Sequence, residues 1–134
     1  MYNTGDMEEF GKIVSIAVGG ALGAVARYLT NISPLGVVFD KFPFPTFVIN
    51  VTGSFLIGVF MILFADRFSS NDNLRTAIVV GFIGAFTTFS TFEMEIFGLV
   101  KEKQLFTAFL YLSLSVVVGF LGVIAGVSLG RRIV

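Results

Sequence analysis

The chain has 134 residues, of which 55% are hydrophobic and only 13% charged, and its formal net charge is zero. Soluble domains carry about 25% charged residues, so this composition is typical of a membrane protein. Lysine and arginine form no basic stripe, which argues against a nucleic-acid partner. The chain contains no cysteine and no histidine, which excludes thiol catalysis, disulfides and the commonest zinc sites.

The order of apolar and polar stretches predicts one all-α membrane domain. Residues 1–12 are acidic, lack the basic start of a signal peptide, and are expected to form a short soluble lead-in. A helix needs roughly 20 apolar residues to cross a bilayer. Within residues 13–134 four stretches reach this length, at about 13–30, 44–65, 75–97 and 105–129. Four crossings place both termini on the same side of the membrane.

Positive charges are nearly balanced between the two ends of these four spans. The side that carries the termini has five: Lys12, Arg67, Arg75, Arg131 and Arg132. The opposite side has four: Arg27, Lys41, Lys101 and Lys103. The difference in positive charge normally orients a membrane protein. A count of five against four leaves two interpretations. Either one orientation is weakly favoured or is set by another factor, or the protein inserts in both orientations and pairs with its inverted copy.

Small residues recur at helical spacing on the first and fourth spans. Gly19 and Gly23 are four residues apart, and Gly122, Gly126 and Gly130 continue the same spacing. Such ladders let helix backbones approach closely in lipid. We therefore expect a tight bundle that assembles into an oligomer, although glycine is also simply common in membrane helices.

Uncharged polar residues follow one face of the second span and one face of the fourth. Thr46, Asn50 and Ser54 are each four residues apart, as are Tyr111 and Ser115. These side chains are neutral hydrogen-bond donors and could line a path through the membrane. Asn50 has an alternative role, because a buried amide can also join two helices through an interhelical hydrogen bond.

The third span contains the most informative stretch, residues 81–92, in which glycine, hydroxyl and phenylalanine residues alternate. Backbone inside a bilayer must satisfy its own hydrogen bonds, so a polar, glycine-rich interruption there marks a functional segment and a place where the helix could break. Phe89 and Phe92 share a helical face among Thr87, Thr88, Ser90 and Thr91. The edges of phenyl rings are positive and could favour an anion.

The charged residues fit passive movement of an anion better than proton-coupled transport. Glu93 and Glu95 lie near the end of the third span, and no span places a carboxylate at its centre. A proton-coupled transporter would be expected to have one there. Arg27 lies about one turn from the end of the first span, where its side chain could reach the membrane surface.

Three segments resemble the Fluc (CrcB) family of fluoride channels. They are residues 19–28 (GGALGAVARY), 46–55 (TFVINVTGSF) and 81–92 (GFIGAFTTFSTF). The resemblance implies a passive fluoride channel in the plasma membrane of a prokaryote, the inner membrane in a Gram-negative cell. It implies an antiparallel, dual-topology homodimer with two separate pores. The balanced charges agree with such a dimer.

The same resemblance implies roles for particular residues. Asn50 would point its amide toward fluoride, and Phe89 and Phe92 would form an aromatic box. The pore wall would include Thr46, Ser90, Thr91, Tyr111 and Ser115, and the vestibule would include Arg27 and Glu95. Position 119 is glycine where some members carry serine, which leaves open how far the polar track extends.

The break in the third span also suggests a cation site. In an inverted dimer the carbonyls of Gly84 and Thr87 from both chains would present four oxygens to one central point, and the family resemblance implies a structural sodium ion (Na⁺) there. The alternative is that threonine hydroxyls or water satisfy these carbonyls.

Three other functions compete with a fluoride channel. A small four-helix drug exporter coupled to protons has a similar size, but it would require a central carboxylate. A non-transporting assembly subunit would use the same polar stripes only to join helices. An enzyme is the least favoured of the three, because the sequence shows no nucleophile–base pair and no metal cluster.

Overall fold

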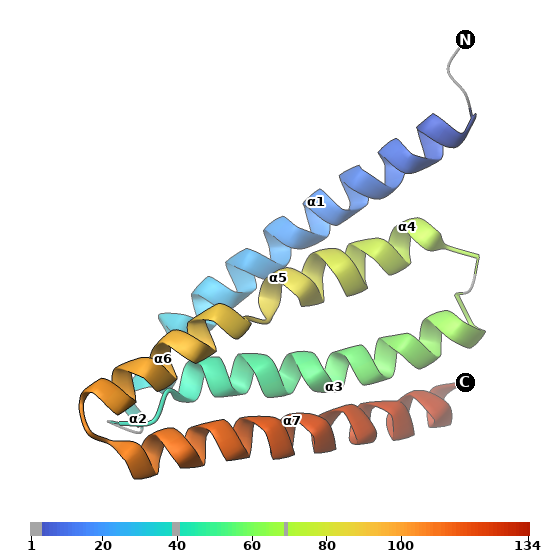
Figure 1. Ribbon diagram of the computed structural model, residues 1–134. Helices are drawn as coiled ribbons and strands as arrows, with labels where there is room; N and C mark the ends of the chain where they lie inside the picture. Colours follow the sequence, from blue (N-terminus) through green and yellow to red (C-terminus); the bar gives the residue numbers. More distant parts are fainter. Residues whose placement is uncertain (1–3, 39–40, 69) are drawn as a thin grey trace.

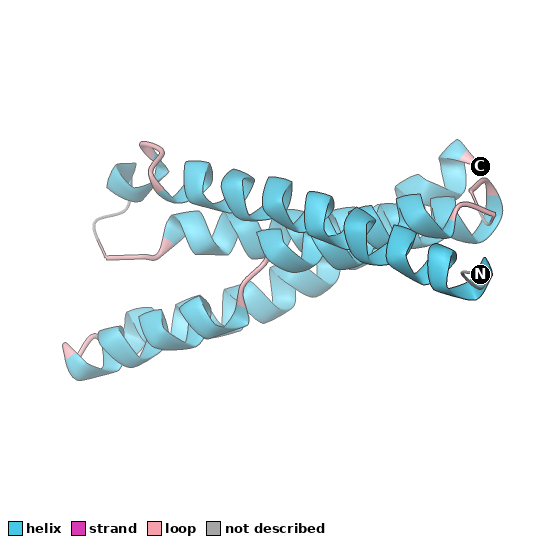
Figure 2. Cartoon of the chain, turned by 90° about the horizontal axis from the view of Figure 1, so that it is seen from above, coloured by secondary structure: helices cyan, strands magenta, loops and turns pink. Residues whose placement is uncertain are grey.

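The computed structural model describes residues 4–38, 41–68 and 70–134, and every regular element within them is helical (Figures 1 and 2). The all-α prediction is therefore confirmed. The elements in chain order are α1 (Thr4–Asn31), α2 (Leu35–Val38), α3 (Phe44–Asp66), α4 (Asp72–Arg75), the π-helix η1 (Thr76–Ile83), α5 (Gly84–Phe86), α6 (Phe89–Lys101) and α7 (Leu105–Ile133).

Four segments of the described residues are long and apolar enough to cross a membrane, which confirms the predicted number of spans. They are Gly5–Asn31, Phe44–Asp66, Asp72–Lys101 and Leu105–Ile133. Each extends beyond the predicted stretch at one end or both, because a helix continues into the polar zone where its apolar sequence has already ended.

The expected lead-in is helical from Thr4 onward and continues directly into α1. Lys12 forms an ion pair with Asp72 at 3.0 Å, which joins α1 to the start of α4. From Thr4 onward, the acidic segment before residue 13 is thus a helical extension of the first span.

The helices pack in two close pairs, α3 with α7 and α1 with η1, and the glycine ladders lie at both contacts (Figure 1). A Cβ atom added to Gly126 of α7 would collide with the carbonyl oxygen of Phe55 in α3. A Cβ atom added to Gly23 of α1 would collide with the carbonyl oxygen of Phe82 in η1. In both pairs glycine allows backbone to meet backbone. The start of α1 and the end of α7 lie at the same end of the molecule.

The third span is not a continuous α-helix. Thr87 and Thr88 have extended backbones (φ −76°, ψ 157° and φ −151°, ψ 119°) and separate α5 from α6. The eight residues before α5 form the π-helix η1, a type of helix that occurs often at functional sites and that the sequence pattern does not reveal. The break lies within the stretch 81–92, so it brings backbone polar groups to the middle of this span.

Candidate functional site

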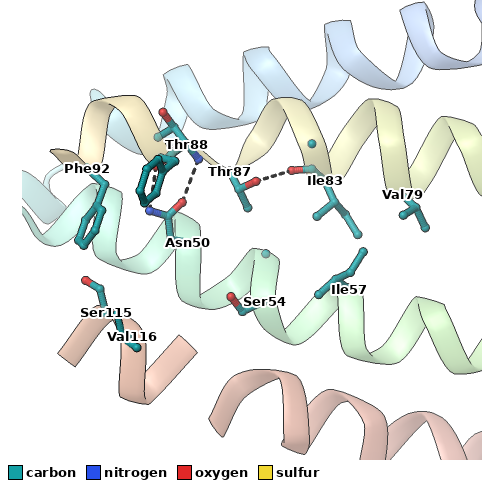
Figure 3. Close-up of a pocket in the computed structure, with 13 residues that line it drawn as sticks. Asn50, Ser54, Ile57, Val79, Ile83, Thr87, Thr88, Phe92, Ser115 and Val116 are labelled. Atoms are coloured by element: carbon teal, nitrogen blue, oxygen red, sulfur yellow. Dashed lines mark hydrogen bonds between the residues drawn. The ribbon is translucent and has the colours of Figure 1, made fainter. Parts of the chain in front are cut away.

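A cavity of about 500 Å³ lies beside the break, between α3, the third span and α7 (Figure 3). It contains the predicted pore residues Asn50, Phe89, Phe92 and Ser115. The complete lining is Asn50, Gly53, Ser54, Ile57, Val79, Ile83, Gly84, Thr87, Thr88, Phe89, Phe92, Ser115 and Val116. Most of this lining is apolar, and its polar side chains are all uncharged.

Asn50 is hydrogen-bonded to both backbone polar groups of Thr88. Its Nδ2 donates to the Thr88 carbonyl at 3.1 Å, and its Oδ1 accepts from the Thr88 N–H at 2.9 Å (Figure 3). The amide thus replaces the helical acceptor that the Thr88 N–H loses at the break, and it adds a second donor to the Thr88 carbonyl at the start of α6. An amide nitrogen has two hydrogens, so one N–H remains outside this pair of bonds. Asn50 therefore joins two helices and still has a donor beside the cavity.

Threonine hydroxyls and an arginine stabilise the rest of the break. Thr88 Oγ1 accepts from the Thr91 N–H at 3.3 Å and caps the start of α6, while Thr87 Oγ1 donates to the Ile83 carbonyl at 2.9 Å. Arg27 Nη1 donates to the Thr87 carbonyl at 3.5 Å. Arg27 therefore contacts the break in the third span, which the sequence pattern could not indicate.

The backbone at Gly84 fits one part of the suggested cation site. In a continuous helix the Thr88 N–H would donate to the Gly84 carbonyl, but here it donates to Asn50. The Gly84 carbonyl lacks this usual donor, whereas the Thr87 carbonyl already accepts from Arg27. Neutral carbonyl oxygens suit a hard monovalent cation. One chain offers only these two, so a complete coordination shell would need a second copy.

Ser115 contributes a buried hydroxyl that has no hydrogen-bond partner among the described residues. It points from α7 toward Phe92 at the edge of the cavity (Figure 3). Buried polar atoms are nearly always paired, and an unpaired one is costly. The Ser115 hydroxyl is thus available to a ligand in the cavity.

Thr46, Glu95 and Tyr111 form a second polar cluster, outside the lining of the cavity. Thr46 Oγ1 donates to Glu95 Oε1 at 2.8 Å, and the Tyr111 hydroxyl donates to Glu95 Oε2 at 2.7 Å. Two of the five hydroxyls predicted for the pore wall, those of Thr46 and Tyr111, are therefore bound to a carboxylate. The sequence did not predict this cluster, because its members come from α3, α6 and α7 and share no spacing along the chain.

The residues of the stretch 81–92 differ in exposure. Phe92 is buried, while Phe89 is 70% exposed, and their ring centroids are 6.2 Å apart with the planes tilted by 41°. Ser90 and Thr91 are exposed, and neither lines the cavity. In the single chain, only part of the predicted pore wall therefore surrounds the cavity.

A family model described as CrcB-like protein, Camphor Resistance (CrcB), matches residues 14–127. The chain belongs to this family. Among relatives, it is 46% identical to a protein of Nitrobacter winogradskyi over 90% of this chain and 96% of the relative. It is 44% identical to one of Acidobacterium capsulatum over 92% and 98%, respectively. It is 41% identical to one of Hahella chejuensis over 90% and 95%. All three relatives are named fluoride-specific ion channel FluC.

Membership agrees with the resemblance that the three sequence segments indicate. The match begins at residue 14, so the helical extension before it lies outside the family model.

Proposed function

We propose that this CrcB-family chain forms a fluoride-selective channel in a prokaryotic plasma membrane. Fluoride enters cells as the neutral weak acid and is trapped when the acid dissociates in the more alkaline cytoplasm. A passive, anion-selective channel then lets fluoride leave down its electrochemical gradient, which reduces its toxicity. The names of the relatives support fluoride as the ion, and the four spans support a multi-pass channel.

The observation that carries this proposal is the unpaired Ser115 hydroxyl in a cavity that also contains the Asn50 amide. Fluoride holds its water tightly, so a selective site must replace that water with strong donors. A cavity with neutral donors and an apolar wall supports this proposal. Chloride is larger and less strongly hydrated, so it gains less from the same donors.

Fluoride efflux from liposomes that contain the purified protein tests the proposal. We expect rapid efflux once charge movement is balanced, with chloride efflux close to that of empty liposomes. Efflux that depends on an imposed proton gradient would indicate the proton-coupled exporter, and the Glu95 carboxylate would then be its candidate proton carrier. Absence of any flux from correctly folded protein would favour the non-transporting assembly subunit.

We further propose that the working form is an antiparallel homodimer with two pores. Phe89 supports a second copy, because a phenyl ring that borders the cavity is 70% exposed in the single chain. A partner would cover this ring and complete an aromatic box with Phe92. Ser90 and Thr91 are exposed on the same helix and would face the second copy or the pore.

A structural sodium ion between the two copies is the last part of the proposal. The carbonyls of Gly84 and Thr87 from each chain would hold it, and its charge would fix the two breaks against each other. Exhaustive replacement of sodium by a bulky organic cation should lower both dimer content and fluoride flux, measured by size-exclusion chromatography and by efflux. Full activity of an intact dimer with no detectable bound alkali metal would contradict the sodium site.

A further inference from the structure

The first loop ends in a tight turn that fixes the direction of one phenylalanine. Pro43 has φ −71° and ψ 67°, the conformation of an inverse γ-turn, and the Phe44 N–H donates to the Phe42 carbonyl at 2.6 Å. The proline ring restricts φ, so this turn loses little entropy when it forms. Phe42 is therefore held in a defined direction directly before α3 begins.

The ring of Phe42 packs edge-on against Tyr111. Their centroids are 5.2 Å apart with an interplanar angle of 78°, and Phe42 makes a second edge contact with Phe47 at 5.6 Å. Tyr111 is completely buried. Edge-to-face pairs of this kind add stability beyond the burial of their area.

On its other side, the Tyr111 ring packs against Phe92, which lines the cavity. Their ring centroids are 5.0 Å apart with an interplanar angle of 64°, and the Tyr111 hydroxyl is anchored on Glu95. Tyr111 thus lies between a loop residue on one side and a residue that lines the cavity on the other. Neither the sequence pattern nor the polar stripes indicated any role for Phe42.

We propose that Phe42 is a positioning residue of the channel, which holds the Tyr111 ring and through it fixes the orientation of Phe92 at the fluoride path. This inference rests on the proposed function of the cavity. The turn at Pro43 holds Phe42 in place, and the hydrogen bond to Glu95 holds the Tyr111 hydroxyl. The ring of Phe92 lines the cavity that we propose as the fluoride path. Loosening Phe42 should therefore disturb conduction without removing any group that borders the cavity.

The tyrosines allow the ring contact to be measured separately from conduction. The chain has three tyrosines and no tryptophan. Replacing Tyr2 and Tyr28 by phenylalanine leaves Tyr111 as the only source of the tyrosine band in the near-ultraviolet circular dichroism, which reports fixed aromatic packing. In this background we compare Phe42→Ala, Phe42→Leu and Phe42→Tyr, with Phe106→Ala as the matched control, since Phe106 is 75% exposed and lies near the same end of the molecule.

Phe42→Ala should weaken the Tyr111 band and lower fluoride flux about threefold to tenfold, the range expected for loss of one aromatic pair. Phe42→Leu keeps the apolar volume, so the protein should still fold. It should also weaken the Tyr111 band and lower fluoride flux, because the aromatic ring is lost. Phe42→Tyr keeps the ring and should restore fluoride flux; it is judged by flux alone, because it adds a second tyrosine to the band. Phe106→Ala should change neither readout. An unchanged tyrosine band, or a weakened band with unchanged flux, would overturn the positioning role. A parent protein without fluoride flux would instead overturn the proposed function, and the band would still report the ring contact.

Discussion

Asn50 occupies the point where the helix break and the cavity meet. A break in a membrane span exposes peptide groups that lipid cannot hydrogen-bond, so a side chain must supply the missing donors and acceptors. Asn50 does so for the Thr88 N–H, and it also donates to the Thr88 carbonyl. The two roles that the sequence left open for Asn50, interhelical bond and pore donor, are therefore compatible in one residue.

Substitution of Asn50 should affect conduction and stability together. Asn50→Ala leaves the Thr88 N–H without an acceptor, which costs about 1–3 kcal/mol for a buried group, whereas the Thr88 carbonyl keeps its helical partner at the start of α6. Asn50→Asp retains an acceptor for the N–H but loses the donor and adds a negative charge beside the anion path. We expect both variants to lower fluoride flux at least about tenfold, measured by liposome efflux, and to lower the thermal unfolding temperature in detergent.

Ser15→Ala is a suitable control for these variants, because the Ser15 hydroxyl donates only to the Gly11 carbonyl within α1. It should leave flux unchanged. If Asn50→Ala lost stability but conducted like the parent, Asn50 would be an interhelical bond alone and the pore donor would have to be sought at Ser115.

Between elements, the close approach of α1 to η1 determines where the break lies. Gly23 meets the Phe82 carbonyl directly, and Gly81 in η1 would place a Cβ atom 2.7 Å from the Ile16 carbonyl. These contacts join backbones, which cannot move aside as a flexible side chain can. The position of the break relative to α1, and hence the contact of Arg27 with Thr87, depends on both glycines.

Gly23→Ala should therefore separate α1 from η1 and destabilise the protein by about 1–3 kcal/mol, the usual cost of overpacking. Thermal unfolding in detergent measures this, and fluoride efflux should fall because the break moves. Gly98→Ala is the matched control, since no heavy atom lies within 4 Å of the added Cβ atom. It should be neutral or stabilising by about 0.5–1 kcal/mol, because alanine loses less entropy in a helix. Equal effects of the two substitutions would contradict the packing argument.

For the whole molecule, the near balance of positive charge is the feature with the largest consequence. The sequence counts five positive residues on one side and four on the other, and one of the four, Arg27, contacts the break in the third span. A difference this small gives the insertion machinery little preference. An inverted dimer would use this balance, because it needs both orientations in similar amounts. The exposed Phe89 and the two carbonyls offered by each chain are consistent with such a partner.

Addition of a few lysines to the loop between α3 and α4 should lock one orientation. A chain locked in this way is expected to be inactive when expressed alone and to regain fluoride flux when co-expressed with an oppositely locked chain. Cysteine accessibility on each side of the membrane reports the orientation, and efflux reports activity. Full activity of one locked orientation by itself would exclude the inverted dimer.

The sequence by itself determined the class of fold, the number of spans and the family, because these depend on run length, composition and local motifs. Helical spacing placed polar residues on one face of a single span, as for Thr46, Asn50 and Ser54. Only the family resemblance grouped Asn50, Phe89, Phe92 and Ser115 across different spans. The helices extend beyond the predicted spans, because polar helix ends carry no apolar signal.

Only the tertiary structure decided which groups meet across helices. Glu95 binds the hydroxyls of Thr46 and Tyr111, Arg27 reaches Thr87, and Phe42 packs on Tyr111. These contacts join residues from different helices or from a loop, so no periodicity in the chain encodes them. The π-helix before the break is decided by the same packing, since a wide turn has no sequence signature of its own.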